Sequence, residues 1–444
     1  MMISDLSNKI QHKKANLAVI GLGYVGLPLA CEFARVGFNV LGIDILDERV
    51  RRINKGDSPI KGIEPGLEDI LAETVSKGTL RASLEYTDIT DRDVILICVE
   101  TPVGEDNMPH YDALRSALVS LGKLIKEGSL VIIESTIAPG TMQHLVKPVL
   151  EESSGLKLNE GFFLGNCPER VMPGKLLMNL RLLNRVVGGM TTETAEIMVK
   201  LYKHIVRADL DPVDCVTAEL VKTVENTYRD VQIAFANEIA LICEQVGGDV
   251  WKVRELVNKS PGRQMLYAGS GVGGPCIPKD PWLLASSVSG SQTPLSIIPA
   301  ARNINDYMPT HMLNLIHAAL AEHNRELAGA KIFIMGYAYM EETGETRNSP
   351  SQSLVYQLSD RQSQVIIHDP YVPQYQGSVL EMARDCDAAV LMVKHQFYQN
   401  LDLKTLRQVL RSGILVDGRS FFGVERANAA GLDYWVLGIA RGVG

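Results

Sequence analysis

The chain has 444 residues, which is too long for one ordinary hydrophobic core, so two or three domains are expected. Hydrophobic residues make up 46% and charged residues 22% of the sequence, and both values are typical of a globular protein. The formal net charge of −8 argues against a surface that binds nucleic acid or another polyanion.

The N-terminal residues and the cysteines indicate the cellular compartment in which the protein is expected. Residues 1–15 are polar and lack the apolar run of a signal peptide, so we interpret them as a loose or helical N-terminal extension. No run of about 18 apolar residues follows, so no membrane span is expected. The seven cysteines are scattered without a C-x-x-C pair, which indicates neither a disulfide framework nor a metal site. A reducing cytoplasm fits best.

Residues 16–205 alternate apolar runs with helical patterns. NLAVI and FNVLGID flank an amphipathic stretch, and further strands are expected at 93–99, at 129–135 and near Phe162. This alternation predicts an α/β fold with a parallel, doubly wound sheet, as in a Rossmann domain. A similar series of runs predicts a second, smaller Rossmann-like domain in residues 326–444.

The region between them, residues 206–325, is expected to be helical, because residues 192–325 lack the strand pattern. Apolar residues recur at helical spacing from Cys215 to Val246. One helix of about thirty residues, roughly 45 Å long, would join the two domains and form the spine of a homodimer. Two shorter helices with a kink are the alternative. A further helix is expected from His311 to His323, after Pro309.

A glycine-rich turn follows the first strand and opens a helix. A dinucleotide site needs the first glycine for the tight turn, the second for approach of the pyrophosphate and the third for helix–strand packing. The helix N-terminus then offers amides to the phosphates. The predicted cofactor-binding residues of this turn are Gly21, Gly23, Tyr24, Val25 and Gly26.

The next strand ends at an acidic residue, Asp44, which lies 21 residues after Gly23. A carboxylate at this place binds the ribose hydroxyls and repels a 2′-phosphate, so NAD is predicted in preference to NADP. Arg49 lies nearby and leaves use of both cofactors open. FAD shares this arrangement and is the less favoured alternative.

A glycine- and proline-rich segment, Gly269 to Asp280, surrounds Cys276. Its small side chains would let a ligand approach closely. Lys279 lies three residues after the cysteine, and Asp280 lies one turn away if a helix starts there. Nearby positive charge or a helix N-terminus turns a thiol into a nucleophile. An inert core cysteine is the alternative for Cys276, and it is our interpretation of the other six.

Together these motifs resemble the UDP-glucose/GDP-mannose dehydrogenase family over nearly the whole chain. The matching segments are IGLGYVGLPLA, CVETP (98–102), ESTIAPGT (134–141), NCPERVMPG (166–174), ELVKTVENTYR (219–229), GVGGPCIPKD (271–280) and TGETRNSP (343–350). The resemblance implies two Rossmann-like domains joined by a long central helix, with the C-terminal domain binding the UDP half of the substrate.

The family reaction removes two hydrides from one carbon and passes them to two NAD molecules. The resemblance implies that Cys276 traps the aldehyde as a thiohemiacetal, which loses the second hydride to become a thioester that water hydrolyses. Lys222 and its i+4 neighbour Asn226 would stabilise the oxygen on C6. Asp280 and Thr136 would hold a water, and Glu169 would act as a base.

The resemblance also implies contacts to the two ligands. Further cofactor contacts are expected from Thr101, Thr136 and Arg347. Substrate contacts are expected from Glu169, Arg170, Val171, Lys222, Asn226, Tyr267, Gly273 and Arg302. Arg302 would reach the sugar site of a partner subunit, and a core-facing helical arginine is the alternative.

The sugar is predicted from the residues around Glu169 and Asp280. Arg170 with Pro173-Gly174, and Pro281-Trp282, resemble the UDP-N-acetylhexosamine branch, and we favour UDP-N-acetylmannosamine, oxidised to a uronic acid for polysaccharide biosynthesis. UDP-glucose and UDP-N-acetylglucosamine are the alternative substrates.

Two other functions remain open. A simple two-electron dehydrogenase would leave the cysteine loop without a purpose. A non-catalytic nucleotide-sugar-binding protein is suggested by Met340, which stands where the family commonly has a substrate-contacting lysine.

Overall fold

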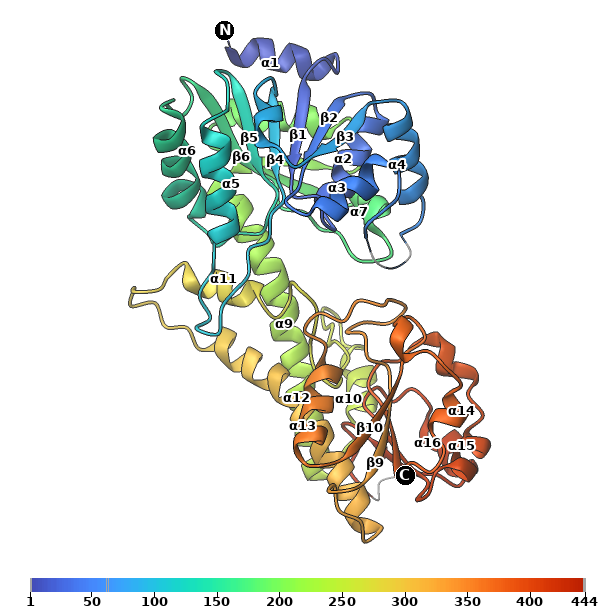
Figure 1. The fold of residues 1–444 in the computed structure, drawn as a ribbon. Helices are drawn as coiled ribbons and strands as arrows, with labels where there is room; N and C mark the ends of the chain where they lie inside the picture. Colours follow the sequence, from blue (N-terminus) through green and yellow to red (C-terminus); the bar gives the residue numbers. More distant parts are fainter. Residues whose placement is uncertain (1, 61, 63, 442–444) are drawn as a thin grey trace. The chain divides into compact units, whose positions relative to one another are not determined.

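The chain divides into two compact units, each with its own sheet (Figure 1). The computed structural model describes residues 2–60, 62 and 64–441. Unit 1 comprises Met1–Glu225 and Trp282–Gln292, and unit 2 comprises Asn226–Pro281 and Thr293–Gly444. The boundary between Glu225 and Asn226 falls inside the long helix α9 (Cys215–Val246).

Unit 1 is built on an eight-stranded sheet with the order β3-β2-β1-β4-β5-β6-β7-β8 among the described residues. The pairing of β6 with β7 is antiparallel, and every other neighbouring pair is parallel. The strands are β1 (Asn16–Ile20), β2 (Asn39–Ile43), β3 (Leu80–Ser83), β4 (Val94–Ile97), β5 (Ser129–Ile133), β6 (Phe162–Asn166), β7 (Arg185–Gly189) and β8 (Leu210–Asp214).

Helices cover both faces of this sheet, so its central strands are apolar on both sides. Leu17 and Val19 of β1 point into the core formed with α2, α4 and α8, whereas Ala18 and Ile20 point into the core formed with α5 and α6. This alternation follows from the two-residue repeat of a strand. The helices are α1 (Met2–Gln11), α2 (Gly26–Arg35), α3 (Asp47–Asn54), α4 (Leu67–Ser76), α5 (Asp112–Gly122), α6 (Lys147–Ser154), α7 (Leu176–Leu182) and α8 (Thr192–Tyr202).

Two strands at one end of the sheet were not predicted. They are β7 and β8, and β8 begins at Leu210, inside the region in which no strand was expected. The prediction was wrong there because β8 (sequence LDPVD) is polar and half-exposed, so it lacks an apolar run. Pro212 has no amide hydrogen to donate, and β8 is an edge strand, where a proline is tolerated.

Unit 2 contains a five-stranded, all-parallel sheet with the order β10-β9-β11-β12-β13. Its strands are β9 (Lys331–Met335), β10 (Gln364–His368), β11 (Ala388–Leu391), β12 (Ile414–Asp417) and β13 (Asp433–Val436). One face packs on α9, α12 and α13, and the other on α14, α15 and α16. The helices are α10 (Val250–Val257), α11 (Asp280–Ser286), α12 (Ile297–Glu322), α13 (Pro350–Asp360), α14 (Val379–Met382), α15 (Leu403–Val409) and α16 (Val424–Ala429); α11 lies mostly in unit 1.

The two long helices were predicted with different success. α9 is one continuous helix of 32 residues, which confirms the long central helix and excludes the two-helix alternative. α12 begins at Ile297, well before the expected start at His311, and contains Pro309. A proline inside a helix costs one backbone hydrogen bond. Burial of Met308 and Met312 on either side of Pro309 offsets that loss.

The two sheets carry the same connection after their first strand. In unit 1 the amide of Leu22 donates to Asp44 Oδ2 at 2.8 Å, so the turn after β1 is tied to the end of β2. In unit 2 the amide of Tyr337 donates to Asp369 Oδ2 at 2.7 Å, which ties the turn after β9 to the end of β10. Both units are therefore Rossmann-like, as predicted from the repeated strand pattern.

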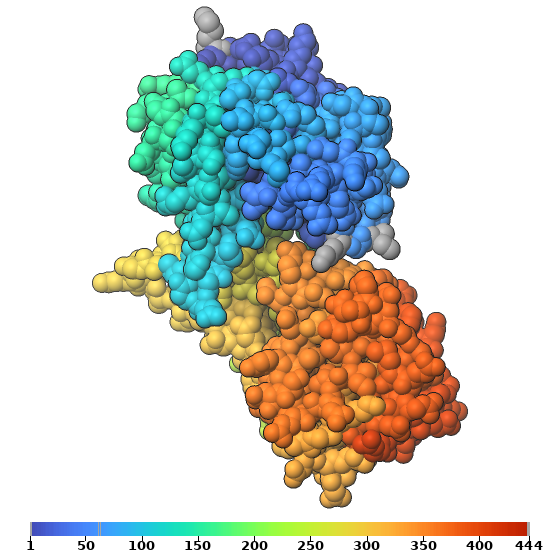
Figure 2. Space-filling view, viewed as in Figure 1, coloured from blue at the N-terminus to red at the C-terminus, as the bar shows by residue number. Residues whose placement is uncertain are grey.

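The N-terminal extension is helical over α1 and packs on unit 1. Leu6 and Ile10 are buried, and Ile10 O lies 3.1 Å from Nε2 of His204, which follows α8. Within the residues that the structure describes, no helix is long and apolar enough to cross a bilayer. In the space-filling view the N-terminal segment, in dark blue, lies directly against the rest of unit 1 (Figure 2).

Candidate functional site

The glycine turn of unit 1 is shaped for a close-lying ligand. Gly21 has φ +89°, and a Cβ there would lie 2.9 Å from the Cys98 carbonyl oxygen. A Cβ on Gly26 would overlap Gly21 O at 1.9 Å, whereas a Cβ on Gly23 would meet nothing within 4 Å. The outer two glycines are therefore needed for packing, and Gly23 leaves the approach to the α2 N-terminus open. These are the features that a dinucleotide pyrophosphate requires.

Two further residues of this turn lie at the start of α2. Tyr24 and Val25 are both half-buried, and Val25 is the N-cap residue. An aliphatic side chain cannot accept a hydrogen bond, so Val25 does not occupy the first amides of α2. Those amides remain suited to phosphate oxygens.

Asp44 organises the ribose end of the predicted cofactor site. Its carboxylate is buried and accepts hydrogen bonds from the amides of Leu22 at 2.8 Å and Leu46 at 3.0 Å. Arg49 Nη1 donates to Asp44 Oδ2 at 2.8 Å. Arg49 is thus neutralised by the acid beside it, which weakens its use for a 2′-phosphate and supports the preference for NAD.

The CVETP and ESTIAPGT segments follow the neighbouring strands β4 and β5 and meet at their carboxyl ends. Thr101 Oγ1 donates to the Thr136 carbonyl oxygen at 2.6 Å. Glu219 of α9 accepts from the amides of Gly140 at 2.7 Å and Met142 at 2.8 Å. The loop that carries Thr136 is therefore fixed at both ends.

Glu169 and Arg170 follow β6 and are both engaged within unit 1. The Glu169 carboxylate is buried; Oε1 accepts from the Arg170 amide at 2.6 Å, and Oε2 lies 2.8 Å from Arg185 Nη2. Arg170 Nε donates to Glu225 at 2.8 Å, and Nη1 donates to the Asn184 carbonyl oxygen at 2.5 Å. The next residue, Val171, packs against the core. Direct substrate contacts from these three residues stay predictions.

Lys222 and Asn226 lie one turn apart on α9, as the i, i+4 spacing requires. Lys222 is 8% exposed. Asn226 belongs to unit 2, where its Nδ2 donates to Asp280 Oδ2 at 2.5 Å. The structure thus brings two of the predicted catalytic residues, Asn226 and Asp280, into direct contact.

The cysteine loop leads into a helix, as expected. α11 begins at Asp280, and the amides of Lys279 and Asp280 donate to the Cys276 carbonyl oxygen at 3.0 and 2.9 Å. Lys279 Nζ donates to Asp280 Oδ1 at 2.7 Å. Gly273 supports the loop from within, since a Cβ there would lie 2.6 Å from the Asn348 carbonyl oxygen.

Cys276 differs from the other cysteines in its surroundings. All seven cysteines lie in the described part of the chain as thiols, and only Cys276 is exposed. Burial raises the pKa of Cys31, Cys98 and Cys167 well above the usual range, and it raises the pKa of Cys215 to about 12 and that of Cys386 to about 11. The thiol available for chemistry is thus the one in the glycine-rich loop.

The remaining predicted site residues of unit 2 contact neighbouring side chains of the same unit. Tyr267 is 54% exposed, and the guanidinium carbon of Arg254 lies 3.5 Å from its ring centroid. Arg347 forms a two-point ion pair with Glu345, at 3.0 and 2.7 Å. Arg302 is 1% exposed and donates to Asp230 at 2.6 Å. This burial favours the core-facing alternative for Arg302, and its contact with a partner's sugar stays a prediction.

Three residues around Glu169 were missed by the sequence analysis. Arg185 begins β7 and lies between Glu134 and Glu169, with Nη2 donating to Glu134 Oε2 at 2.7 Å. Tyr202, the last residue of α8, donates its hydroxyl to Glu134. The available signal was an arginine at the start of an apolar run, where a fully buried cation needs a carboxylate partner.

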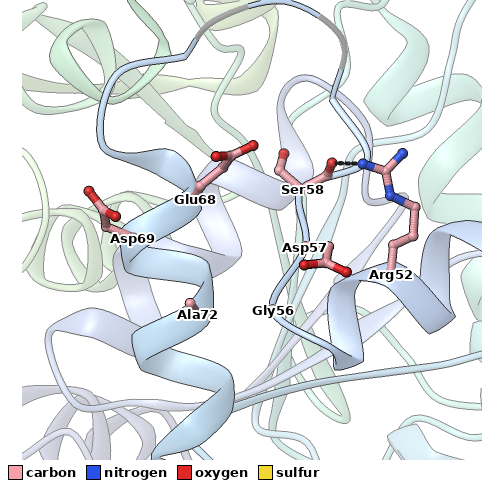
Figure 3. Close-up of a pocket in the computed structure, with 7 residues that line it drawn as sticks. All are labelled: Arg52, Gly56, Asp57, Ser58, Glu68, Asp69 and Ala72. Carbon is pink, nitrogen blue, oxygen red and sulfur yellow. Dashed lines mark hydrogen bonds between the residues drawn. The ribbon is translucent and has the colours of Figure 1, made fainter.

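A separate cavity of 390 Å³ lies between α3 and α4 and is lined by Arg52, Gly56, Asp57, Ser58, Glu68, Asp69 and Ala72 (Figure 3). Arg52 donates to the Ser58 carbonyl oxygen across its rim. None of the predicted site residues lines this cavity. No group of three or more potential metal ligands occurs among the residues described.

A Rossmann domain with an open glycine turn and a buried acid after its second strand, in a chain with an exposed cysteine, is typical of an NAD-dependent oxidoreductase. Three models of the UDP-glucose/GDP-mannose dehydrogenase family match the chain: the NAD binding domain at residues 15–206, the central domain at 216–307 and the UDP binding domain at 333–424. The chain belongs to this family and is a nucleotide-sugar dehydrogenase that uses NAD.

Individual relatives are similar over nearly their whole length. The UDP-N-acetyl-D-mannosamine dehydrogenase of Pyrococcus horikoshii is 37% identical, over 91% of this chain and 95% of the relative. The enzyme of the same name from Campylobacter jejuni is 34% identical, over 92% of this chain and 97% of the relative. The solved structure of the Pyrococcus horikoshii UDP-D-ManNAc dehydrogenase matches with a TM-score of 0.90 at 36% identity, over 97% of this chain and all of that chain.

Proposed function

We propose that this enzyme oxidises the C6 alcohol of UDP-N-acetylmannosamine to the uronic acid, using two NAD per sugar. The observation that carries this proposal is the exposed Cys276 thiol in its glycine-rich loop, next to the Asn226–Asp280 contact. The relatives named for the same sugar support the manno epimer over UDP-glucose and UDP-N-acetylglucosamine. A simple two-electron dehydrogenase would not need this thiol.

NAD, when bound at the glycine turn and Asp44, supplies the hydride acceptor. After the first oxidation, the Cys276 thiolate attacks the C6 aldehyde and forms a thiohemiacetal. Loss of the second hydride converts it to a thioester, and water then releases the acid and the thiolate. The thiol is needed because a bare aldehyde has no tetrahedral carbon from which a second hydride can leave.

The other residues stabilise charge and move protons. Lys222 and Asn226 donate to the oxygen on C6 when it becomes negative in each tetrahedral intermediate. Asp280 orients Asn226 through their hydrogen bond. As the family resemblance implies, Asp280 and Thr136 would together hold a water. Glu169 takes the proton of the water that attacks the thioester.

We also propose that the protein is a homodimer assembled through α9. Large apolar side chains are exposed along this helix at spacings of four or seven residues: Val216, Leu220, Val224, Tyr228, Phe235, Ile242 and Val246. Such a stripe is the pattern of a helix that packs on another helix. A second copy of α9, carrying the same stripe, would cover it in a two-fold arrangement. Tyr228→Glu with Phe235→Glu should then give a monomer in size-exclusion chromatography with light scattering.

We further propose a cytoplasmic location for the enzyme and a role for its product in polysaccharide biosynthesis. All seven cysteines are thiols, which suits a reducing cytoplasm. An acetamido-uronic acid on UDP is an activated building block, so we place the product in polysaccharide biosynthesis.

The test is the number of NADH molecules formed per acid. Purified enzyme is incubated with UDP-N-acetylmannosamine, UDP-N-acetylglucosamine or UDP-glucose and NAD, and both products are counted. We expect two NADH per acid, with the manno sugar preferred. Cys276→Ser should abolish acid formation, whereas the matched control Cys243→Ala, in a buried thiol of α9, should keep the ratio of two. A ratio near one, or full activity of Cys276→Ser, would contradict the thioester route.

A further inference from the structure

Arg185 is a fully buried cation shared by two carboxylates. Its side chain is 1% exposed, and those of Glu134 and Glu169 are 0% and 3% exposed. One nitrogen, Nη2, lies 2.7 Å from Glu134 Oε2, 2.8 Å from Glu169 Oε2 and 3.2 Å from the Cys167 carbonyl oxygen. The hydrogen bonds of Nη2 go to Glu134 and to the Cys167 carbonyl oxygen, whereas Glu169 Oε2 receives no hydrogen bond and is held by charge alone. The buried Nε and Nη1 atoms of Arg185 have no hydrogen-bond partner among the described residues. The electrostatic hold of Arg185 on Glu169 therefore depends on the charge of Glu134.

The cluster of Arg185, Glu134 and Glu169 carries a net negative charge when both carboxylates are ionised. One guanidinium then faces two negative charges in a site without solvent, which is unfavourable. Burial, together with the charge of Glu169, raises the pKa of Glu134 to about 7, although Arg185 and the Tyr202 hydroxyl act in the opposite direction. Glu134 is therefore neutral below about pH 7 and ionised above it.

The strands and the helix packed around Glu134 bring several ionisable side chains close to its carboxylate. Glu134 follows β5, at the centre of the sheet of unit 1. The ionisable groups that face it are Cys98 after β4, Cys167 and Glu169 after β6, Arg185 of β7 and Tyr202 of α8. Burial raises the pKa of both thiols and of the Tyr202 hydroxyl well above the usual range, so these three groups stay protonated. Glu134 is thus the member of the group that changes charge near neutral pH.

We propose that Arg185 and Glu134 are positioning residues for Glu169, and that competition between the two carboxylates for Arg185 sets whether Glu169 is held in an ion pair or is available to the attacking water. When Glu134 is ionised, it draws the guanidinium away from Glu169, whose carboxylate is then available as a base. When Glu134 is neutral, Arg185 pairs with Glu169 alone and holds it as an ion pair. The inference rests on the base role of Glu169 in the proposed function.

The step affected is hydrolysis of the Cys276 thioester. The water oxygen forms a bond to the thioester carbonyl carbon, and the water proton passes to the Glu169 carboxylate. The C–S bond then breaks, and its electron pair leaves with the Cys276 sulfur as thiolate. As Glu169 becomes neutral, the Arg185 guanidinium turns fully to Glu134, so its charge stays paired throughout.

The test separates thioester hydrolysis from hydride transfer. The intact enzyme is mixed with NAD and UDP-N-acetylmannosamine in rapid-mixing experiments between pH 5.5 and 8.5. NADH absorbance reports hydride transfer, and mass spectrometry of quenched samples reports the acyl group on Cys276. For the wild type we expect the rate of hydrolysis to rise with pH through an inflection near 7, the pKa of Glu134.

Variants of three residues, with small changes in shape, give distinct expectations for the pH dependence of hydrolysis. Glu134→Gln keeps the side-chain volume but cannot ionise, so the inflection disappears and hydrolysis is slowed roughly tenfold or more at pH 8, with thioester accumulating. Tyr202→Phe removes a hydrogen bond that lowers the pKa of Glu134, so the inflection moves to higher pH. Arg185→Lys keeps the charge and should retain more hydrolysis than Arg185→Met. Thermal unfolding of each variant serves as the control for folding.

The outcomes distinguish this inference from the proposed function. If Glu134→Gln and Tyr202→Phe slow hydride transfer and hydrolysis equally, with an unmoved inflection, the cluster is only structural and the inference fails. If Glu169→Gln hydrolyses the thioester at the wild-type rate, the base role of Glu169 fails. If Glu169→Gln accumulates thioester but the Glu134 and Tyr202 variants behave as wild type, only the positioning role is overturned.

Discussion

Asn226 donates its side-chain amide to the Asp280 carboxylate at 2.5 Å, and this bond joins the long helix α9 to the first residue of α11. Asp280 is completely buried, and its other oxygen pairs with Lys279. Because the carboxylate can only accept, it fixes the Asn226 amide with Nδ2 toward Asp280 and Oδ1 away from it. The rotamer of Asn226 is therefore set by a residue four positions after Cys276.

The variant Asn226→Asp tests whether the Asn226 amide stabilises the negative charge that develops on the substrate. The variant places two carboxylates side by side, so the hydrogen bond is lost and the developing negative charge on the substrate meets another one. We expect kcat to fall by roughly 10²- to 10³-fold, the range for loss of one oxyanion donor. Steady-state kinetics with both substrates measure this. Asn226→Ala is the control, and equal kcat for the wild type and both variants would contradict the assigned role.

A thiol-labelling experiment follows from the contrast among the cysteines. The folded enzyme should react quickly with a chromogenic disulfide reagent at one thiol per chain, because five of the other six thiols are buried, Cys98 is partly buried, and the pKa values of all six are raised. In denaturant all seven should react. The fast phase should vanish in Cys276→Ser. A fast phase of two or more thiols in the folded wild type would show that another cysteine is accessible.

Removal of the Arg302 side chain tests whether this residue serves the fold or the substrate. Arg302→Met leaves the Asp230 carboxylate buried without its cation, which typically costs about 3–5 kcal/mol. Denaturant unfolding should show that loss. Asp306→Asn, at the solvent-facing partner of Arg302, should cost less than about 1 kcal/mol. Wild-type stability of Arg302→Met combined with a raised KM for the sugar would instead support contact with a partner's substrate.

Stability should respond to pH through Glu219. Burial raises the pKa of Glu219 from 4.5 to about 7, so folding favours its protonated form. The contribution of protonated Glu219 to the free energy of unfolding is fully present below about pH 4.5, and it is lost as the pH rises through 7. Relative to Glu219→Gln, the free energy of unfolding of the wild type should therefore fall by roughly 3 kcal/mol between pH 4.5 and 8. Parallel denaturant titrations at several pH values measure it, and a constant difference between the two proteins would exclude this titration.

Much of the fold was predictable because strongly periodic segments carry their own signal. The apolar runs of β1, β4, β5 and β9 and the 32-residue α9 were expected from the sequence. β8 was not, since an edge strand needs no apolar run, and the start of α12 was misplaced because Pro309 is normally read as a helix boundary. Propensity rules describe isolated elements, and packing overrides them at both places.

The candidate site was predictable only where a motif has a fixed spacing. The glycine turn with Asp44 and the cysteine loop with Asp280 are such motifs. The pairing of Arg185 with Glu134 and Glu169 joins residues 51 and 16 positions apart, and no local pattern connects them. Likewise, spacing alone could not show that Arg302 is enclosed by Asp230 from another helix.

The division of the chain between Glu225 and Asn226 has a practical consequence. Domains are usually separable by protease or by truncation, since an exposed linker joins them. Here the boundary lies within an unbroken helix, between Lys222 and Asn226, so any cut there severs helical hydrogen bonds and splits the predicted catalytic pair. We expect that neither half can be produced as an autonomous, active fragment. Activity should therefore require the two units in one uncut chain.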